Sequence, residues 1–191
     1  MICSSYFDLK LRPSADEITN WDRFGRLIRA LHVGATQTNV KFAIDFPEWM
    51  REGFSLGDRI RVFGSESNSL NQLYDSIEAC SWFEDEVEGG RIRTVKEVKG
   101  YHALLHHSFG GGVIKDRKGI GLDKIRETRA QRKMAFMAKA QSLPYIKILS
   151  STGKQFCLRL ERIHATQSDT GEPNGYGVSR PTQIIALPVL P

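Results

Sequence analysis

Alternating apolar residues near the start of the chain limit its fold more than any other feature of the sequence. Phe7, Leu9 and Leu11 are separated by single polar residues, which is the period of a strand with one buried face. Residues 40–46 repeat this pattern, and residues 59–63 predict a third strand that ends at Gly64. The first part of the chain therefore predicts a sheet of short strands.

Two segments have the apolar spacing of helices. One lies between the first and second predicted strands, and the other follows the third. The first can begin at an N-cap of Ser14 or Asp16, ends at Gly34, and keeps its apolar positions on one face: Ile18, Trp21, Leu27, Ile28 and Leu31. The second is marked by three apolar positions: Leu70, Leu73 and Ile77. A fourth strand is expected at residues 91–98.

The resulting order is strand, helix, strand, strand, helix, strand. This is the split β-α-β pattern of a ferredoxin-like (RRM-like) domain, which we expect over residues 1–98. The fold class is therefore predicted to be α+β. Residues 99–191 are expected to form a separate C-terminal α/β region.

The C-terminal region begins with a helix and returns to strands. Residues 122–141 contain neither Gly nor Pro and are mostly good helix formers, so they predict one long helix. Residues 145–149 and 156–163, separated by a Ser-Ser-Thr-Gly turn, predict a β hairpin. A last apolar stretch at residues 184–190 completes the terminal β structure.

Positive charge is concentrated around the predicted long helix. The chain has a formal net charge of +5. Residues 115–133 hold eight basic and three acidic residues, so their excess equals that of the whole chain. A basic segment on an otherwise neutral protein is typical of a polyanion-binding surface.

Other features narrow the class of protein. No run of about 18 apolar residues exists, and the first six residues lack the basic start and apolar stretch of a signal peptide. The three cysteines, Cys3, Cys80 and Cys157, lie far apart without a CxxC pair, which fits a reducing compartment. We therefore expect a cytoplasmic protein without disulfides. No metal or other cofactor is expected, because His102, His106 and His107 lack nearby Cys or carboxylate partners.

Six motifs, in order, resemble one known family. They are YFDLKLRP, RALH, KFAIDFPEW, LGDRIRVFG, the LPYIKIL and STGKQFCLRL hairpin, and GYGVS. Together they resemble the type I-F CRISPR repeat-processing (pre-crRNA) endoribonucleases. The resemblance runs nearly end to end and is weakest at residues 101–141.

The resemblance implies a function. Members of that family cut precursor CRISPR RNA at the base of the repeat hairpin without a metal. The 2′-hydroxyl of the RNA attacks the adjacent phosphate, leaving a 2′,3′-cyclic phosphate and a 5′-hydroxyl. The enzyme then stays bound to the mature crRNA with the other subunits of the type I-F surveillance complex.

The resemblance places the catalytic histidine at His32. Imidazole exchanges protons near neutral pH, and such catalysis typically contributes ~10²–10⁴-fold. Ile28 is an alternative match one turn earlier, but its side chain transfers no proton. Whether His32 acts as base, acid or both is left open.

Three further residues match positions at the family's active site. Ser150, with Ser151 as the alternative, matches the serine that positions the nucleophile, although Ser-Ser-Thr-Gly is also an ordinary turn sequence. Tyr176 matches a tyrosine whose hydroxyl orients the histidine, and its rival interpretation is a packing tyrosine with a hydrogen-bonded hydroxyl. Phe156 matches an aromatic residue that stacks on a base at the foot of the stem, and core packing is its rival interpretation.

The basic segment is expected to hold the RNA. Its helix and the preceding loop should neutralise phosphates through Arg126, Arg129, Arg132, Lys133, Lys115, Arg117 and Lys118. In one member of the family an Arg and a Gln, two residues apart, read bases low in the stem, and those places hold His106 and Ser108 here. His107 is an alternative base reader.

Two rival hypotheses need no catalytic histidine. One is a non-catalytic subunit that binds structured RNA within the same complex. The other is a structural assembly protein whose basic helix docks an acidic partner.

Overall fold

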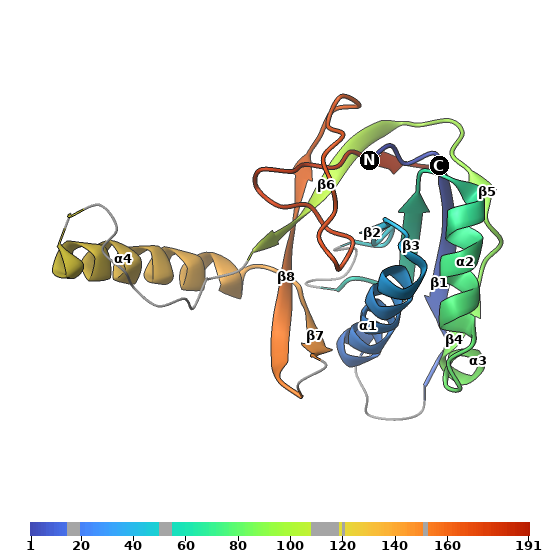
Figure 1. Cartoon of the computed structure of the whole chain (residues 1–191), viewed down its shortest axis with the longest axis horizontal. Coiled ribbons are helices and arrows are strands. Elements are labelled where there is room, and N and C mark those ends of the chain that lie inside the picture. Colours follow the sequence, from blue (N-terminus) through green and yellow to red (C-terminus); the bar gives the residue numbers. More distant parts are fainter. Residues whose placement is uncertain (15–19, 50–54, 108–118, 120, 151–152) are drawn as a thin grey trace.

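The computed structural model describes residues 1–14, 20–49, 55–107, 119, 121–150 and 153–191. Two antiparallel sheets lie side by side, and one long helix projects away from both (Figure 1). The elements in chain order are β1 (Ser5–Leu11), α1 (Asn20–Thr38), β2 (Ala43–Asp45), β3 (Arg59–Gly64), α2 (Ser67–Glu78), α3 (Phe83–Glu86), β4 (Val87–Gly89), β5 (Arg93–Thr94), β6 (Gly100–His107), α4 (Leu122–Gln141), β7 (Tyr145–Leu149), β8 (Gln155–His164) and β9 (Leu187–Val189).

The first sheet has the topology that the sequence predicts. Its strand order is β2-β3-β1-β4, with β5 also paired to β1, and neighbouring strands are antiparallel. Together with the element order, this is a ferredoxin-like arrangement, so the α+β class is confirmed. The alternating residues Phe7, Leu9 and Leu11 are all buried in the core, as are Leu70, Leu73 and Ile77 of α2.

The prediction of one strand at residues 91–98 is wrong. Two short strands replace it: β4 pairs with Leu9–Leu11 and β5 pairs with Ser5 and Tyr6. The register shifts by one residue between these pairings, and the Gly90 amide donates to the Asp8 carbonyl at 2.7 Å. The extra residue is a β-bulge, which divides the strand in a way that apolar spacing does not reveal.

The predicted end of the first helix at Gly34 is also wrong. Helix α1 continues to Thr38 and ends at Asn39, which has a φ of 54°. The Val40 amide then donates to the Ala35 carbonyl at 3.0 Å, which completes a Schellman motif. Gly34 serves packing instead, because a Cβ there would lie 2.2 Å from Ser76 Oγ on α2. The proposed cap Asp16 and the apolar Ile18 lie outside the described residues.

The second sheet has the order β7-β8-β6-β9. The predicted hairpin is confirmed, since Ile146 pairs with Leu158 and Ile148 with Phe156. The sequence did not predict β6, which pairs with both β8 and β9. The first sheet ends at Thr94 and the second begins at Gly100, but a single apolar core includes buried residues of both.

Helix α1 joins the two sheets. A Cβ at Gly25 would lie 1.7 Å from the Lys147 carbonyl oxygen, so only glycine permits this contact between helix and strand backbones. Beside it, Lys147 Nζ lies 3.5 Å from Asp22 Oδ1, and the Trp21 and Tyr145 rings meet edge to face at 4.6 Å. The earlier helix residue, Trp21, contacts the earlier strand residue, Tyr145, and the later residues Asp22 and Gly25 contact Lys147. The helix α1 and the strand β7 therefore run in the same direction.

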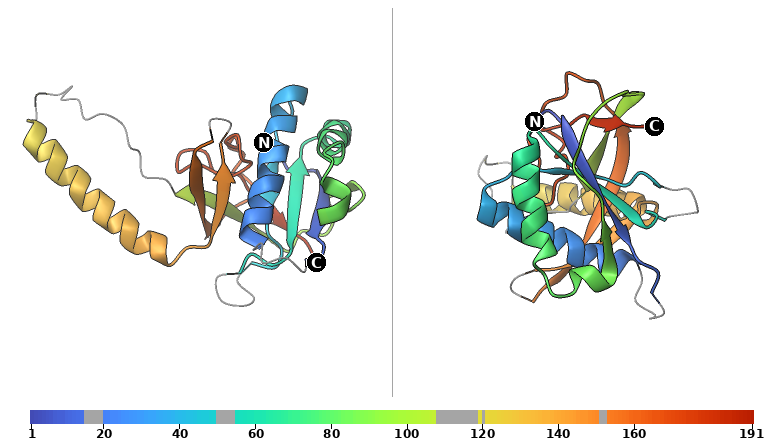
Figure 2. Two further views of the ribbon diagram at one scale, coloured as in Figure 1. Left: turned by 90° about the horizontal axis from the view of Figure 1, so that it is seen from below. Right: turned by 90° about the vertical axis from the view of Figure 1, so that its right-hand side faces the viewer.

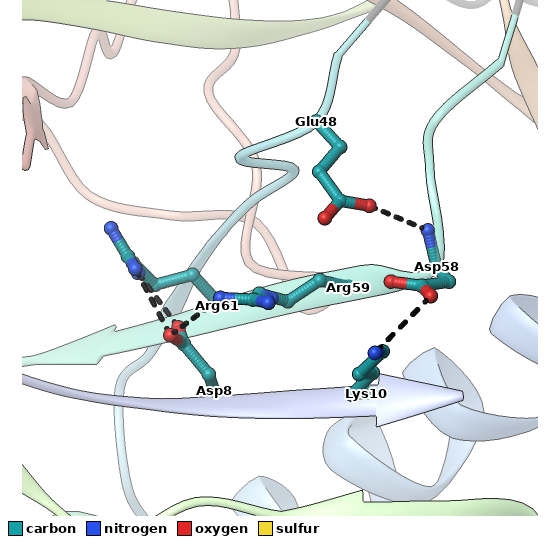
Figure 3. Close-up of polar contacts among 6 residues, drawn as sticks. All are labelled: Asp8, Lys10, Glu48, Asp58, Arg59 and Arg61. Atoms are coloured by element: carbon teal, nitrogen blue, oxygen red, sulfur yellow. Dashed lines mark hydrogen bonds and ion pairs between the residues drawn. The ribbon is translucent and has the colours of Figure 1, made fainter. Parts of the chain in front are cut away.

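A cluster of ion pairs connects the two central strands of the first sheet (Figure 3). Arg61 donates to both carboxylate oxygens of Asp8, at 2.7 and 3.0 Å, from directly paired positions on β3 and β1. Lys10 Nζ lies 3.8 Å from Asp58 Oδ2. The Asp58 amide in turn donates to Glu48 Oε2 at 3.0 Å, which ties the segment after β2 to the start of β3.

A buried carboxylate connects the first sheet with the second. Asp45 Oδ1 accepts hydrogen bonds from His102 Nε2 at 2.8 Å and from Arg162 Nη2 at 2.9 Å. Arg162 also donates to the Phe46 carbonyl and lies 5.1 Å from the centre of the Trp49 ring. Burial alone would raise the pKa of Asp45, but the hydrogen bond from His102 and the nearby positive charges outweigh it, so the pKa is lowered.

The first prediction concerns this carboxylate. Removing one partner of a buried ion pair costs about 3–5 kcal/mol, so Asp45→Asn should lower the free energy of unfolding by about that amount at neutral pH. The lowered folded pKa stabilises the wild type above 3.8, the ordinary carboxyl value, and this gain is lost as pH falls further. Urea unfolding at pH 7 and pH 3 should therefore show a smaller gap between the two proteins at pH 3.

The matched control is Asp123→Asn. Asp123 pairs with Arg126 at 3.1 Å on the exposed surface of α4, so its loss should cost less than about 0.5 kcal/mol. Equal destabilisation by the two substitutions would show that the contact of Asp45 with the second sheet has no special importance.

Candidate active site

A tight loop near the C-terminus forms one wall of the candidate site. Asn174 Oδ1 accepts hydrogen bonds from the amides of Tyr176, at 2.9 Å, and Val178, at 3.3 Å. Gly177 has a φ of 76°, and its carbonyl accepts the Ile44 amide at 2.8 Å. The loop is therefore fixed both by its own side chain and by the backbone of β2.

His32 contacts this loop from α1. Its Nδ1 lies 2.7 Å from the Gly175 carbonyl oxygen. A carbonyl only accepts hydrogen bonds, so Nδ1 carries the proton, and the neutral ring keeps the Nε2 lone pair for another partner. This geometry suits a group that takes up and releases a proton at Nε2.

Gly175 must be small for this contact to form. A Cβ at that position would lie 2.9 Å from Cε1 and 3.0 Å from Nδ1 of His32. The same glycine thus supplies the acceptor and makes room for the ring. The sequence interpretation did not identify Gly175 or Asn174 as site residues, although Asn-Gly is a strong turn signal.

Two of the predicted aromatic residues lie in a row beside His32. The His32 and Tyr176 ring centres are 4.9 Å apart, and those of Tyr176 and Phe156 are 5.5 Å apart. Phe156 is only half-buried, whereas Leu158 and Leu160 on the same face of β8 are fully buried. The contact between His32 and Tyr176 is between rings, and the role of the Tyr176 hydroxyl stays a prediction.

Ser150 directly follows β7 at the turn of the hairpin. Its hydroxyl accepts the Lys154 amide at 3.0 Å, and its own amide donates to the Lys154 carbonyl at 2.8 Å. The left view of Figure 2 shows α1, which carries His32, beside β7, which Ser150 follows. The alternative Ser151 lies outside the described residues.

Helix α4 presents the predicted basic residues. Arg126, Arg132 and Lys133 are exposed, and Arg129 is partly covered. Within α4, all of which the structure describes, Ala140 is the one buried residue. The helix projects away from the sheets, and only its C-terminal end meets them (Figure 1). Four residues predicted to bind RNA lie outside the described part of the chain: Ser108, Lys115, Arg117 and Lys118.

The C-terminal end of α4 is anchored by charges on β6 and β8. Arg159 donates to the Ala140 carbonyl at 2.6 Å. Glu161 accepts from Lys139 at 2.8 Å and from His107 at 2.6 Å. Burial acts to raise the pKa of Glu161, but its bonds to Lys139 and His107 lower it overall.

His106 lies on β6 beside this anchor. Burial and the neighbouring charge of His107 lower its pKa. Its amide donates to the Ser179 carbonyl at 3.1 Å, just after the loop that holds His32. A base-reading role for His106 or His107 remains a prediction.

A small hollow of 160 Å³ opens beside His32. Its walls come from the end of α1, the start of β2 and the segment before the Gly175 loop: His32, Ala35, Thr36, Val40, Lys41, Phe42, Pro173, Asn174 and Gly175. At its rim Lys41 Nζ lies 2.6 Å from Glu172 Oε1. The hydrogen bond from Lys41 and its charge lower the pKa of Glu172.

The described residues contain no group of three His, Cys, Asp or Glu side chains placed to hold a metal ion. In the same part of the chain, no helix is long and apolar enough to cross a membrane.

The fold and the site define a ferredoxin-like α+β protein with an exposed basic helix and a histidine held by a backbone carbonyl. The profile of the family described as CRISPR-associated protein (Cas_Csy4) matches residues 6–189, so the chain belongs to this family. The family is one of endoribonucleases that process CRISPR repeat RNA, and the resemblance drawn from the motifs is confirmed.

Other comparisons are more distant. A solved structure described as "Characterization of a Cas6-related gene from Pyrococcus furiosus" is 11% identical, with a TM-score of 0.38. The match covers 96% of this chain and 98% of that one. No curated protein matches the chain.

The second prediction tests the packing of His32 on Gly175. Gly175→Ala should destabilise the fold by about 1 kcal/mol, because the new methyl group forces the imidazole to move. In a His32→Ala background the same substitution should cost almost nothing. Chemical unfolding of all four proteins in this cycle measures the coupling, and equal costs in both backgrounds would show that the ring does not rest on Gly175.

Proposed function

We propose that this chain is a metal-independent endoribonuclease that cuts precursor CRISPR RNA at the base of the repeat hairpin. The observation that carries the proposal is the hydrogen bond between His32 Nδ1 and the Gly175 carbonyl, which leaves Nε2 as the reactive nitrogen. Family membership supplies the substrate class.

The proposed reaction is an internal transesterification. A base removes the proton of the 2′-hydroxyl, the 2′-oxygen bonds to the adjacent phosphorus, and the bond from phosphorus to the 5′-oxygen breaks. The leaving 5′-oxygen takes up a proton. The products are a 2′,3′-cyclic phosphate and a 5′-hydroxyl, and no water is consumed. Nε2 of His32 takes or gives one of these protons.

The neighbouring residues position the substrate in this proposal. Ser150 orients the 2′-hydroxyl from the turn that follows β7. Tyr176 holds the imidazole through ring contact, and Phe156 offers its exposed part to the base at the foot of the stem.

Helix α4 binds the stem in this proposal. The basic residues on it neutralise phosphates along the RNA, and the same contacts hold the product after cleavage. Retention of the cut RNA would let the protein enter the type I-F surveillance complex with its other subunits in the cytoplasm.

The third prediction tests the chemistry. With repeat hairpin RNA and EDTA, wild type should cleave, and His32→Ala should be slower by about 10²–10⁴-fold, because the proton-transfer group is lost. RNA with a 2′-deoxyribose at the scissile position should bind normally and stay intact. Gel assays with end-group analysis of the products measure both results.

Two outcomes would contradict this proposal. Cleavage of the deoxy RNA would rule out attack by the 2′-hydroxyl. Tight binding without cleavage by either protein would favour the non-catalytic RNA-binding subunit.

The fourth prediction tests α4. Replacing Arg126, Arg129, Arg132 and Lys133 by alanine should weaken hairpin binding and reduce the slope of log affinity against log salt by about one unit per lost phosphate contact. Fluorescence anisotropy across a salt series measures the slope.

A matched control removes the same charge elsewhere. Four basic residues near the edge of the first sheet are exposed: Arg91, Arg93, Lys96 and Lys99. Their replacement by alanine should change the slope much less. Equal changes in the two variants would mean that net charge, and not α4, determines RNA affinity.

A further inference from the structure

The hollow beside His32 has a rigid apolar wall and a charged rim. The Schellman motif at the end of α1 turns the chain so that Ala35 and Val40, both 9% exposed, meet on one side. Phe42 also lines the hollow and is 2% exposed. Lys41 lies between the buried residues Val40 and Phe42, at the rim of the hollow, and its side chain is 63% exposed.

Apart from His32, the hollow and the aromatic row consist of different residues. Among the described residues, Gly175 and Asn174 border the hollow, while Tyr176 and Phe156 do not. In the proposed reaction Phe156 meets the base at the foot of the stem, on the 5′ side of the cut. The nucleotide on the 3′ side must then leave His32 in another direction, and the hollow offers that room.

Lys41 is available to a phosphate. Its partner Glu172 is 65% exposed, and ion pairs between such exposed side chains contribute little to stability. An RNA phosphate can therefore replace the Glu172 carboxylate at little cost. The exposed Thr36 hydroxyl donates to the His32 carbonyl at 2.8 Å, and its lone pairs can accept a bond from a ribose hydroxyl.

We propose that this hollow binds the ribonucleotide on the 3′ side of the cut, with Lys41 pairing with the phosphate that follows it. Glu172 competes with that phosphate for Lys41. This inference rests on the proposed function, because it assigns a direction to the RNA at His32.

The fifth prediction compares two uncleavable hairpin RNAs, each with a 2′-deoxyribose at the scissile position. One ends at the scissile phosphate, and the other continues for three nucleotides. Wild type should bind the longer RNA about two- to fivefold more tightly, a size typical of an exposed charge pair. Lys41→Met should remove this difference and lower the salt slope for the longer RNA by about 0.7. Glu172→Gln should enlarge the difference.

Lys10→Met is the matched control, because Lys10 forms a similar exposed ion pair with Asp58 on the first sheet (Figure 3). It should leave the binding of both RNAs unchanged. Lys41→Met and Glu172→Gln are expected to change the affinity difference between the two RNAs in opposite directions. A general loss of stability would not produce opposite effects. Circular dichroism would confirm that all variants are folded.

Two results would overturn the inference. One is equal affinity of wild type for the two RNAs. The other is a Lys41→Met effect that is the same for both RNAs or is matched by Lys10→Met. None of these measurements requires cleavage, so the absence of nuclease activity would refute the proposed function and leave the test of the hollow intact.

Discussion

The contact between the backbones of α1 and β7 at Gly25 determines how the rest of the molecule is arranged. At this point the helix lies so close to the strand that a methyl group would overlap the Lys147 carbonyl. The helix belongs to the ferredoxin-like half, and the strand belongs to the second sheet. The close contact at Gly25 therefore ties the helix that carries His32 to the strand that Ser150 follows.

The site also depends on distant parts of the sequence. His32 and Gly175 are 143 residues apart, and their hydrogen bond forms only when the C-terminal loop packs on the helix. The loop in turn rests on β2 through Ile44 and Gly177. The second sheet is joined to that strand by the buried bonds of Asp45. The imidazole is therefore oriented by the same tertiary contacts that stabilise the chain.

Local periodicity predicted the elements that bury one face, such as β1, α2 and the β7–β8 hairpin. It failed where contacts between distant segments determine the ends of helices and strands. Gly34 looks like a helix end, but it allows α2 to approach, and a one-residue bulge divides the strand before Gly100. In β6 the residue that contacts Asp45 is the polar His102. This strand therefore lacks the apolar alternation by which β1 was predicted. Resemblance placed His32, Tyr176 and Phe156, which the fold brings together. The Asn174-Gly175 pair indicates a turn, but it does not show that the Gly175 carbonyl binds His32, since every residue carries a carbonyl.

The isolation of α4 separates the proposed RNA-binding surface from the apolar core. Ala140 is the one buried residue along this helix, so substitutions on its other positions leave the apolar core untouched. Mutations there carry little thermodynamic penalty, whereas changes around Gly25 or Gly175 disturb the scaffold. If α4 binds the RNA stem as proposed, substitutions on this helix can change RNA recognition without altering the contacts that hold His32.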